Sequence, residues 1–400
     1  MRGRPRHEVA EIVERYLRSQ PEGLDVGWSW EQRAVADRIL ACRTARLGGH
    51  VDACDECGYT EISYNSCRNR HCPKCQGNAQ ADWLEARQAD VLPVPYAHVV
   101  FTLPQMLAPL ALQNPKVVYD LLLRTVAHTL QEIAHNPKHL GARLGFFAIL
   151  HTWGQTLVHH PHVHCVVPAG GLADDGRTWK PCRPGFFLPV RVLSRLFRGK
   201  FLAGLTQAFR DGRLDLHGRL ARYRRPAVFN RLLHEARGIE WVVYAKPPFN
   251  GPEHVLEYLA RYTHRVAISN HRLQQVDDQA VTFRFKDYRS YRVRSLTLPL
   301  GEFVRRFLLH VLPKGFVRIR YYGFLANGTR AQLLSRCRDA LGQPDAAAGP
   351  DTEHAEDGEW FLDLLPLGLR LCPHCRKGML RCVQLLERPP PDHRCRRVAA

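Results

Sequence analysis

The amino-acid sequence predicts an α+β fold with zinc-binding modules, and three observations indicate it. Segments with apolar residues at helical spacing alternate with short β-branched runs that end at proline or glycine. Two later segments, AVTFRFKDY and SYRVRSLTL, alternate at period two and predict a hairpin. Cys-x-x-Cys pairs lie near both ends of the chain. With 400 residues, the chain is long enough for two or three domains around a packed core.

The charge balance predicts a polyanionic partner. Lys and Arg number 57 against 38 Asp and Glu, which gives a formal net charge of +19. Arginine supplies most of the surplus, and its planar fork suits bidentate phosphate contacts and stacking on bases. A surplus of this size favours nucleic acid over a charge that serves only solubility.

Other bulk features exclude whole classes of function. No signal peptide and no apolar run of membrane-spanning length is found, so we expect no membrane partner. Thirteen cysteines in a chain without an export signal favour thiols and metal ligands over disulfides. We therefore expect the protein to be located in the cytoplasm, associated with the nucleoid. No Walker-type loop or GxGxxG follows a strand, so no nucleotide cofactor is expected.

Residues 1–45 predict a small helical lead-in, because Val9, Ile12, Val13 and Tyr16 recur at helical spacing. Residues 46–90 predict a zinc-binding, DNA-binding module containing HVDACDECGYTEISYNSCRNRHCPKCQ. Two Cys-x-x-Cys turns present four thiolates, and we expect these two turns to complete one structural zinc site. The residues between them leave ligand exchange or a second ion open. The candidate zinc ligands of the module are Cys54, Cys57, Cys67, His71, Cys72 and Cys75.

Basic residues interleave with these ligands. Arg68, Arg70 and Lys74 would make the surface of the module basic, so we expect the zinc to support a DNA-binding knob.

A second domain is predicted over residues 92–342. A buried strand at 98–102 and two helical stretches, at 105–113 and 116–135, lead to a strand that begins His162-Val163-His164 and stops at Pro168 and a Gly-Gly turn. Side chains alternate along a strand, so His162 and His164 leave by one face. Two imidazoles so placed are suited to a divalent cation; taken alone, the pattern is more typical of hydrogen-bonded structural histidines.

A predicted helix about a hundred residues later carries Tyr258 and Tyr262, one turn apart on one face. Alone the pair is typical of amphipathic packing. Together with the histidine strand, in a strongly basic protein, it indicates a phosphoryl-transfer site with tyrosine nucleophiles and a phosphate-polarising metal.

The rest of the domain is basic. Residues 185–238 are predicted to be mostly helical and rich in Arg, and a strand starts at Trp241. The hairpin is predicted to expose a basic sheet edge suited to single strands, and a helix over 303–312 and a strand FVRIRYYG follow. The expected nucleic-acid-binding residues of the hairpin are Arg284, Lys286, Arg292 and Arg294.

The C-terminal part predicts a flexible linker over 343–359, rich in Ala, Pro, Asp and Glu, and a tail over 360–400. The tail holds a third Cys-x-x-Cys, Cys372 and Cys375, with Cys382 and Cys395 behind it. A second zinc ribbon there is an even alternative to unligated thiols, because the later cysteines form no second knuckle.

Over nearly its whole length the chain resembles the HUH-type transposases of rolling-circle insertion sequences, specifically the insertion sequence 91 family. The motifs that carry the resemblance are, in order, SCRNRHCPKCQ, LPVPYAHVVFTLP, LHTWGQTLVHHPHVHCVVPAGGL, YLARYTHRVAISN and HVLPKGFVRIRYYG. The resemblance implies a nuclease domain whose antiparallel sheet, flanked by helices, carries His162 and His164. It also implies that Tyr258 and Tyr262 match the tyrosine pair of the family; because members with one catalytic tyrosine exist, Tyr262 is favoured if only one is essential.

This resemblance implies a metal-dependent tyrosine endonuclease and strand transferase. Mg²⁺ or Mn²⁺ on His162 and His164 would polarise a phosphate of single-stranded DNA, at transposon ends and target, and a tyrosine would form a 5′-phosphotyrosine link. The other expected metal cofactor is structural Zn²⁺. The third ligand of the catalytic ion stays open between Gln155 and His159, and His151 and His160 are assigned structural or phosphate-contacting roles.

Two other classes of function stay open at this point. One is a plasmid rolling-circle replication initiator or relaxase with the same chemistry. The other is a zinc-containing nucleic-acid-binding protein without catalysis, in which the histidines and tyrosines belong to the core.

Overall fold

The computed structural model describes residues 5–21, 26–75, 83, 86–88, 90–249, 267–287, 290–342 and 370–389. The chain forms two compact units. One contains residues 76–345 together with 1–7, and the other contains residues 8–75 and 346–400.

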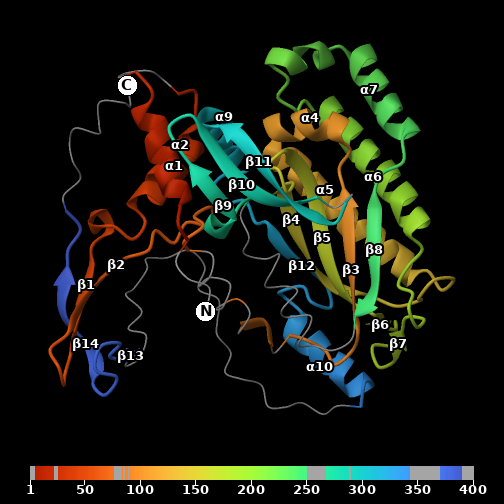
Figure 1. Ribbon diagram of the computed structural model, residues 1–400. Helices are drawn as coiled ribbons and strands as arrows, with labels where there is room; N and C mark the ends of the chain where they lie inside the picture. The colour runs from red at the N-terminus through yellow and green to blue at the C-terminus, as the bar shows by residue number, and fades with distance from the viewer. Residues whose placement is uncertain are drawn as a thin grey trace. The chain divides into compact units, whose positions relative to one another are not determined.

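A five-stranded antiparallel sheet forms the centre of the larger unit (Figure 1). Its strand order is β12-β4-β5-β3-β8, and all four neighbouring pairs run antiparallel. The strands are β3 (Tyr96–Thr102), β4 (Gly145–Trp153), β5 (His159–Pro168), β8 (Val243–Phe249) and β12 (Ile319–Gly323). The predicted strands at 98–102, at the histidine motif, after Trp241 and at FVRIRYYG are therefore confirmed, as is the α+β class.

Helices cover one face of this sheet. They are α4 (Ala108–Gln113), α5 (Pro115–His135), α6 (Val190–Arg210) and α7 (Pro226–Gly238), with η2 (Gln105–Leu107) before α4 and η3 (Gly218–Arg224) before α7. Val163, Cys165 and Val167 of β5 point into this layer, where they join one continuous apolar core with buried side chains of the helices. Burial of these apolar side chains is the main force that fixes the sheet against the helices.

The opposite face changes character along the strands. At one end Phe147, Ile149 and Val166 form a second apolar core with Leu334 and Cys337 of α10 (Arg330–Ala340). Further along β4 and β5 the side chains on that face become histidines. Residues 170–172, expected as a Gly-Gly turn, instead form the short strand β6 (Gly170–Leu172), which pairs with β7 (Trp179–Pro181).

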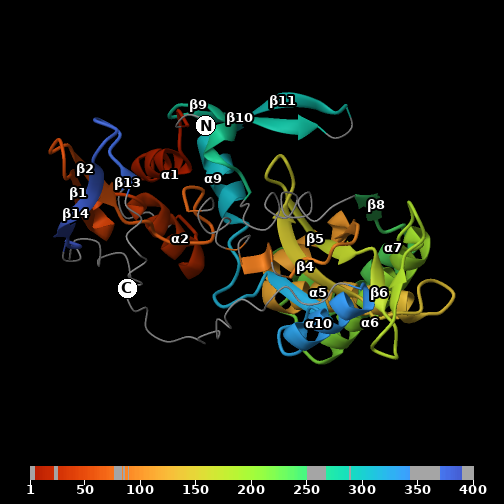
Figure 2. The same cartoon turned by 90° about the horizontal axis from the view of Figure 1, so that it is seen from below.

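A second sheet in the larger unit has the order β11-β10-β9. Its strands are β9 (Leu273–Val276), β10 (Ala280–Asp287) and β11 (Arg292–Pro299), preceded by η4 (Asn270–Arg272) and followed by α9 (Leu300–Leu308). The predicted hairpin is confirmed, and Figure 2 shows β10 and β11 extending side by side from the rest of this sheet. Phe283 packs edge-on against Phe303, which joins α9 to the sheet.

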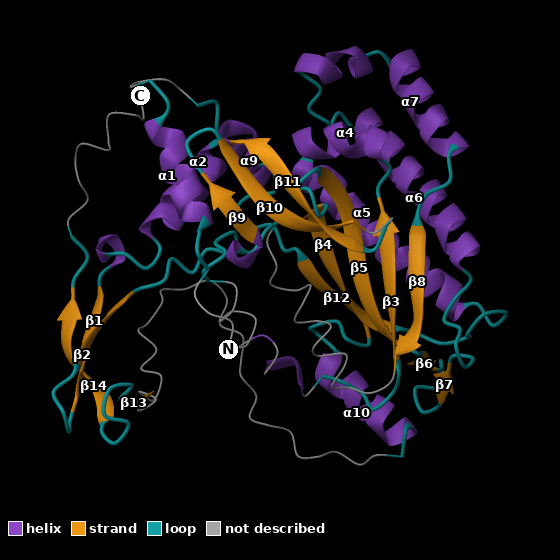
Figure 3. Cartoon of the chain, in the orientation of Figure 1, coloured by secondary structure: helices purple, strands orange, loops and turns teal. Residues whose placement is uncertain are grey.

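The smaller unit combines helices with a sheet made from both ends of the chain (Figure 3). Helices α1 (Val9–Arg18) and α2 (Trp30–Ala41) lie in the segment that carries helical signals in the sequence, and η1 (Ala45–Leu47) follows. The four-stranded sheet has the order β13-β14-β1-β2. Its strands are β1 (Gly49–Cys54), β2 (Thr60–Tyr64), β13 (Arg370–Leu371) and β14 (Met379–Leu386). None of the helices among the described residues is both long and apolar enough to cross a bilayer.

Gly323, the last residue of β12, lies in a crowded part of the larger unit, and its substitution tests how much this crowding affects stability. Its backbone φ is +63°, and a Cβ there would overlap the carbonyl oxygen of Leu144. Gly323→Ala is therefore expected to lower the free energy of unfolding by about 3 kcal/mol, because backbone strain and overlap with a rigid atom add. Gly315→Ala is the matched control: its φ is +75° but nothing lies near a Cβ, so the loss should be about 1 kcal/mol. Urea denaturation measures both, and equal losses would contradict the role of the crowding.

Candidate active site and metal centres

The register of three neighbouring strands gathers histidines on one face of the central sheet. His162 of β5 lies opposite His151 of β4 and opposite Thr102 of β3. His164 lies opposite Ile149 and Val100. Directly paired residues in an antiparallel sheet share a face, so His151, His162 and His164 all point the same way. The structure thus has His162 and His164 on one face, as the alternation predicts, and adds His151.

The three imidazoles are close enough to share one ion. One ring nitrogen from each of His151, His162 and His164 lies within 4.8 Å of the others. His151 and His164 are buried, and His162 is partly buried. The Nδ1–H of His162 donates to the carbonyl oxygen of His160 over 2.7 Å, which orients the ring and leaves Nε2 with its lone pair.

His98 of β3 extends this group. Its Nε2 and the Nδ1 of His164 share a hydrogen bond of 2.8 Å, and the two rings stack nearly parallel. Such a contact from a second imidazole fixes which nitrogen of His164 faces outward. Burial lowers the pKa of His98 to about 3 and that of His162 to about 4, and it holds the pKa of His164 well below its ordinary value. The rings are therefore neutral at pH 7, the form in which imidazole binds a metal.

Neither residue expected as the third ligand lies in this group. His159 points to the opposite face, where its Nε2 shares a hydrogen bond of 2.8 Å with the Tyr119 hydroxyl of α5. Gln155 lies in the turn between β4 and β5, where its Oε1 accepts from the backbone N–H of Lys286. The expectation for His159 is wrong because alternation along β5 sends it into the helix layer with Val163 and Cys165. His151, for which the sequence predicts a structural or phosphate-contacting role, lies beside His162 and His164 instead.

The two tyrosines expected as nucleophiles, Tyr258 and Tyr262, lie outside the described residues. Their position relative to the histidines is therefore an inference from the sequence pattern alone.

The basic residues of the hairpin are all exposed but divide between its two faces. Arg284 and Lys286 share one face of β10, because Arg284 pairs with Ser295 and Lys286 with Val293. Arg294 pairs with Phe285 and Arg292 with Asp287, which places both on the other face. Arg294 also forms a 3.3 Å ion pair with Asp287. The predicted single basic edge is therefore two basic faces, one with Arg284 and Lys286 and the other with Arg292 and Arg294.

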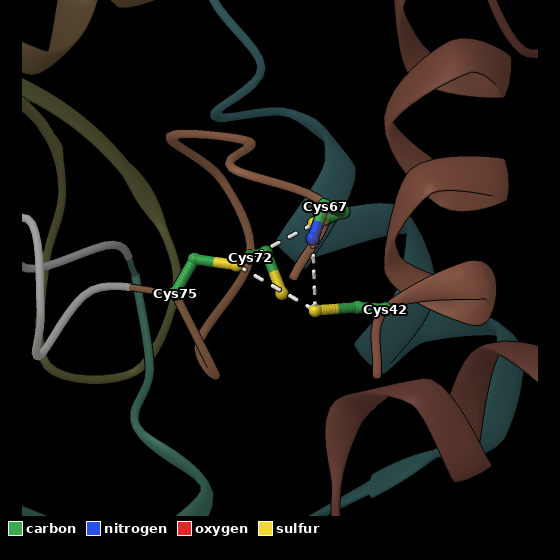
Figure 4. A group of neighbouring side chains, drawn as sticks. All are labelled: Cys42, Cys67, Cys72 and Cys75. Carbon is green, nitrogen blue, oxygen red and sulfur yellow. Dashed lines mark hydrogen bonds between the residues drawn. The ribbon is translucent and has the colours of Figure 1, made fainter. Parts of the chain in front are cut away.

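The smaller unit brings four cysteine sulfurs together beside α2. Figure 4 shows the side chains of Cys42, Cys67, Cys72 and Cys75 converging, and one sulfur from each lies within 4.8 Å of the others. The Sγ atom of Cys75 lies 3.5 Å from that of Cys42 and 3.6 Å from that of Cys67. Sulfurs around one tetrahedral zinc ion lie about 3.8 Å apart, so these distances fit an ion and are too long for disulfides.

This cluster corrects the expected pairing of the cysteines. The two N-terminal Cys-x-x-Cys turns do not complete one site, because Cys54 and Cys57 group with Cys372 and Cys375 instead. Cys42 takes the fourth position beside Cys67, Cys72 and Cys75. Cys42 is the C-cap residue of α2 and had no Cys-x-x-Cys partner to signal it. His71 is buried, yet among the described residues it belongs to neither group of ligand atoms.

The basic residues of the module differ in their freedom to meet a ligand. Arg68 and Arg70 are exposed. Lys74 is mostly buried, forms a 2.6 Å ion pair with Glu8, and donates to the carbonyl oxygen of Cys42. Its charge therefore serves the packing of the module against α1 and α2.

Comparison with known proteins matches both units. A family described as "Putative transposase" matches residues 145–332, and one described as "Transposase zinc-binding domain" matches residues 10–103. A protein of Sinorhizobium fredii (strain NBRC 101917 / NGR234) titled "Putative transposase y4qJ" is 53% identical over 392 residues, which are 97% of this chain and 98% of that protein. The "Transposase for insertion sequence element IS801" of Pseudomonas savastanoi pv. phaseolicola is 32% identical over 339 residues, 84% of this chain and 80% of that protein.

The matched regions include both the histidine strands and the cysteines of the N-terminal module, and the Sinorhizobium fredii relative matches almost end to end. These matches agree with the antiparallel sheet, the cysteine clusters and the basic surface described above. The chain is therefore a nucleic-acid-processing protein with a structural zinc module, and it belongs to the insertion sequence 91 family of transposases.

Proposed function

We propose that this transposase cleaves and rejoins single-stranded DNA through a 5′-phosphotyrosine intermediate during rolling-circle transposition. The observation that carries the proposal is the convergence of His151, His162 and His164 on one sheet face in a protein of net charge +19. A set of converging imidazoles can hold a metal ion, and such an ion would activate the phosphodiesters on which a transposase acts.

The donor set fits a divalent ion. Three imidazole nitrogens, each from a residue on a strand, lie close enough together to hold a divalent ion, and oxygen atoms could complete its coordination. We assign Mn²⁺ or Mg²⁺ to this site, with nitrogen ligands favouring Mn²⁺ of the two. A bound ion would polarise the scissile phosphate and offset the negative charge that builds on its oxygens.

Neighbouring groups of the protein orient the three imidazole rings. His98 holds His164, and the His160 carbonyl holds His162, so both rings are fixed before substrate binds. His151 is stacked on Trp153, with ring centroids 4.5 Å apart, which restrains the third ring. Preorganised ligands avoid reorganisation during the reaction.

The nucleophile is assigned to the tyrosine pair, Tyr258 and Tyr262, on the strength of the family resemblance. A phenolate oxygen of one tyrosine forms a bond to phosphorus while the bond from phosphorus to the 3′ oxygen breaks. The departing oxygen takes up a proton and becomes a 3′-OH, and the phosphotyrosine bond retains the energy for rejoining. The second tyrosine then accepts the strand in the next transfer, so the reaction needs no nucleotide cofactor.

The exposed basic residues of the hairpin favour the proposal that the substrate is single-stranded. Arg284 and Lys286 lie on one face, and the Nζ of Lys286 sits 5.8 Å from the centre of the Tyr291 ring, which is itself 78% exposed. Cations beside an exposed aromatic ring suit a backbone phosphate and a stacked base. Arg68 and Arg70 add exposed charge on the zinc module.

A covalent adduct tests the proposal. The full-length protein is incubated with Mn²⁺ and a labelled single-stranded oligonucleotide from an element end, and a protein–DNA adduct that survives boiling in detergent is measured. The expected result is an adduct in the wild type, loss in Tyr258→Phe/Tyr262→Phe, and loss in one of the two single variants. Tyr223→Phe is the control: the Tyr223 hydroxyl accepts a hydrogen bond from Arg222 in η3, and this variant should keep the adduct.

The outcomes separate the classes of function. An adduct that persists in Tyr258→Phe/Tyr262→Phe would reject the tyrosine mechanism. Tight binding without an adduct on authentic ends would favour a zinc-containing binding protein without catalysis. Cleavage confined to plasmid origins would favour a replication initiator.

A further inference from the structure

A second cysteine cluster draws its members from both the N-terminal and the C-terminal part of the chain. Cys54 is the last residue of β1 and Cys57 lies in the turn that follows, whereas Cys372 and Cys375 lie between β13 and β14. One sulfur from each lies within 4.8 Å of the others. The matched zinc-binding domain ends at residue 103, so it contains only half of this cluster.

We propose that these four cysteines hold a second zinc ion, which fastens the C-terminal tail to the N-terminal module. The distances fit: the Sγ of Cys54 lies 3.7 Å from that of Cys375, and the Sγ of Cys57 lies 3.8 Å from that of Cys372. Tetrahedral zinc with bonds of about 2.3 Å sets its sulfurs about 3.8 Å apart. All four cysteines are free thiols in the structure, and the same distances are far too long for disulfides.

The backbone around the cluster is arranged as in a zinc knuckle. The N–H of Gly378 donates to the Sγ of Cys375 over 3.4 Å, which stabilises a thiolate. A Cβ at Gly378 would lie 2.5 Å from the Sγ of Cys54, so glycine is required for the two turns to approach. His374 stacks on Tyr59 with planes 2° apart and closes the side of the cluster.

Strand pairing places the two turns together. β14 pairs with β1 from Gly49 and Leu386 to Cys54 and Leu380. Asp55, in the first turn, accepts from the backbone N–H of Met379 over 2.7 Å and pairs with Arg381 over 3.1 Å. The sheet thus brings the two Cys-x-x-Cys pairs to the same end of adjacent strands. The four thiols pack against few apolar side chains, so a shared metal ion would stabilise their grouping.

The site implies that neither end of the chain completes this module alone. β14 is an internal strand of the four-stranded sheet, between β13 and β1, and the turn that leads into it supplies two of the four ligands. The zinc-binding module therefore gains its second ion only when the C-terminal segment is present. This conclusion is independent of the cleavage chemistry, since it concerns metal content.

Zinc stoichiometry of full-length variants tests whether the site is shared. After dialysis against a weak chelator, the wild type is expected to hold two zinc ions per chain by elemental mass spectrometry. Cys54→Ser and Cys372→Ser should each hold one, and Cys54→Ser/Cys372→Ser should still hold one, because both changes damage the same site. A double variant that holds none would show two separate sites, and a wild type with a single ion would equally overturn the proposal. Cys382→Ser is the control and should hold two.

Alkylation of the unmodified protein gives a second test that needs no variant. Cys57 and Cys382 are both exposed, but only Cys57 belongs to the cluster. Brief iodoacetamide treatment followed by peptide mass spectrometry is expected to modify Cys382 at least about tenfold faster than Cys57. A strong chelator should remove that difference. Equal modification of the two thiols before chelation would refute a bound ion at this site.

Discussion

Replacing His151 with alanine is expected to slow single-strand cleavage by about a thousandfold and to weaken Mn²⁺ binding by at least about a hundredfold. His151 supplies one of three nitrogens within 4.8 Å, and His162 and His164 would be left as two ligands. Two imidazoles orient an ion poorly and release it readily. Titration with Mn²⁺ followed by electron paramagnetic resonance measures the affinity without requiring turnover, and adduct formation measures the rate.

His159→Ala is the matched control, because His159 lies on β5 together with His162 and His164 but faces the helices. It shares a hydrogen bond with Tyr119 there, so the variant should lose about 1 kcal/mol of stability. Its Mn²⁺ affinity should stay within about twofold of the wild type, since no ligand is removed. If His151→Ala bound Mn²⁺ as tightly as His159→Ala does, the third ligand would have to be another group.

The elements of the larger unit could be predicted from local pattern because period and stop signals are local. The β-branched run after His162 that stops at Pro168 forms β5, and the period-two segments form β10 and β11. The strand order β12-β4-β5-β3-β8 could not be predicted from local pattern, because it depends on pairing between distant segments.

The third histidine was missed for the same reason. Whether His151 faces His162 depends on the register of β4 against β5, and a shift of one residue would send it to the other face. Alternation within β5 was enough to place His162 with His164. It was also enough to exclude His159, three positions before His162, had the strand been known to begin there.

The cysteines show the limit of spacing as a guide. Cys-x-x-Cys indicates that two thiolates share an ion, but it does not say which pair completes the site. Cys54 and Cys57 are close in sequence to Cys72 and Cys75, yet they group with Cys372 and Cys375 across the β1–β14 pairing. Sequence separation of more than 300 residues hid that partnership.

Cys42→Ser is expected to remove one of two bound zinc ions and to unfold the segment around Cys67, whereas His71→Gln should keep both ions. Cys42, Cys67, Cys72 and Cys75 place four sulfurs around one centre, and removal of one leaves a three-thiolate site of much lower affinity. His71 is equally buried and lies beside Cys72, so it controls for disturbance of packing.

Structural zinc contributes folding free energy directly, so the two variants should also differ in resistance to proteolysis. Loss of the ion exposes the backbone around Cys67 to cleavage, and this effect should be absent in His71→Gln. Elemental mass spectrometry and limited trypsin digestion of the full-length protein measure the two effects. If His71→Gln lost the ion and Cys42→Ser kept it, His71 would be the fourth ligand beside Cys67, Cys72 and Cys75, and Cys42 would be a buried thiol at the end of α2 without a metal role.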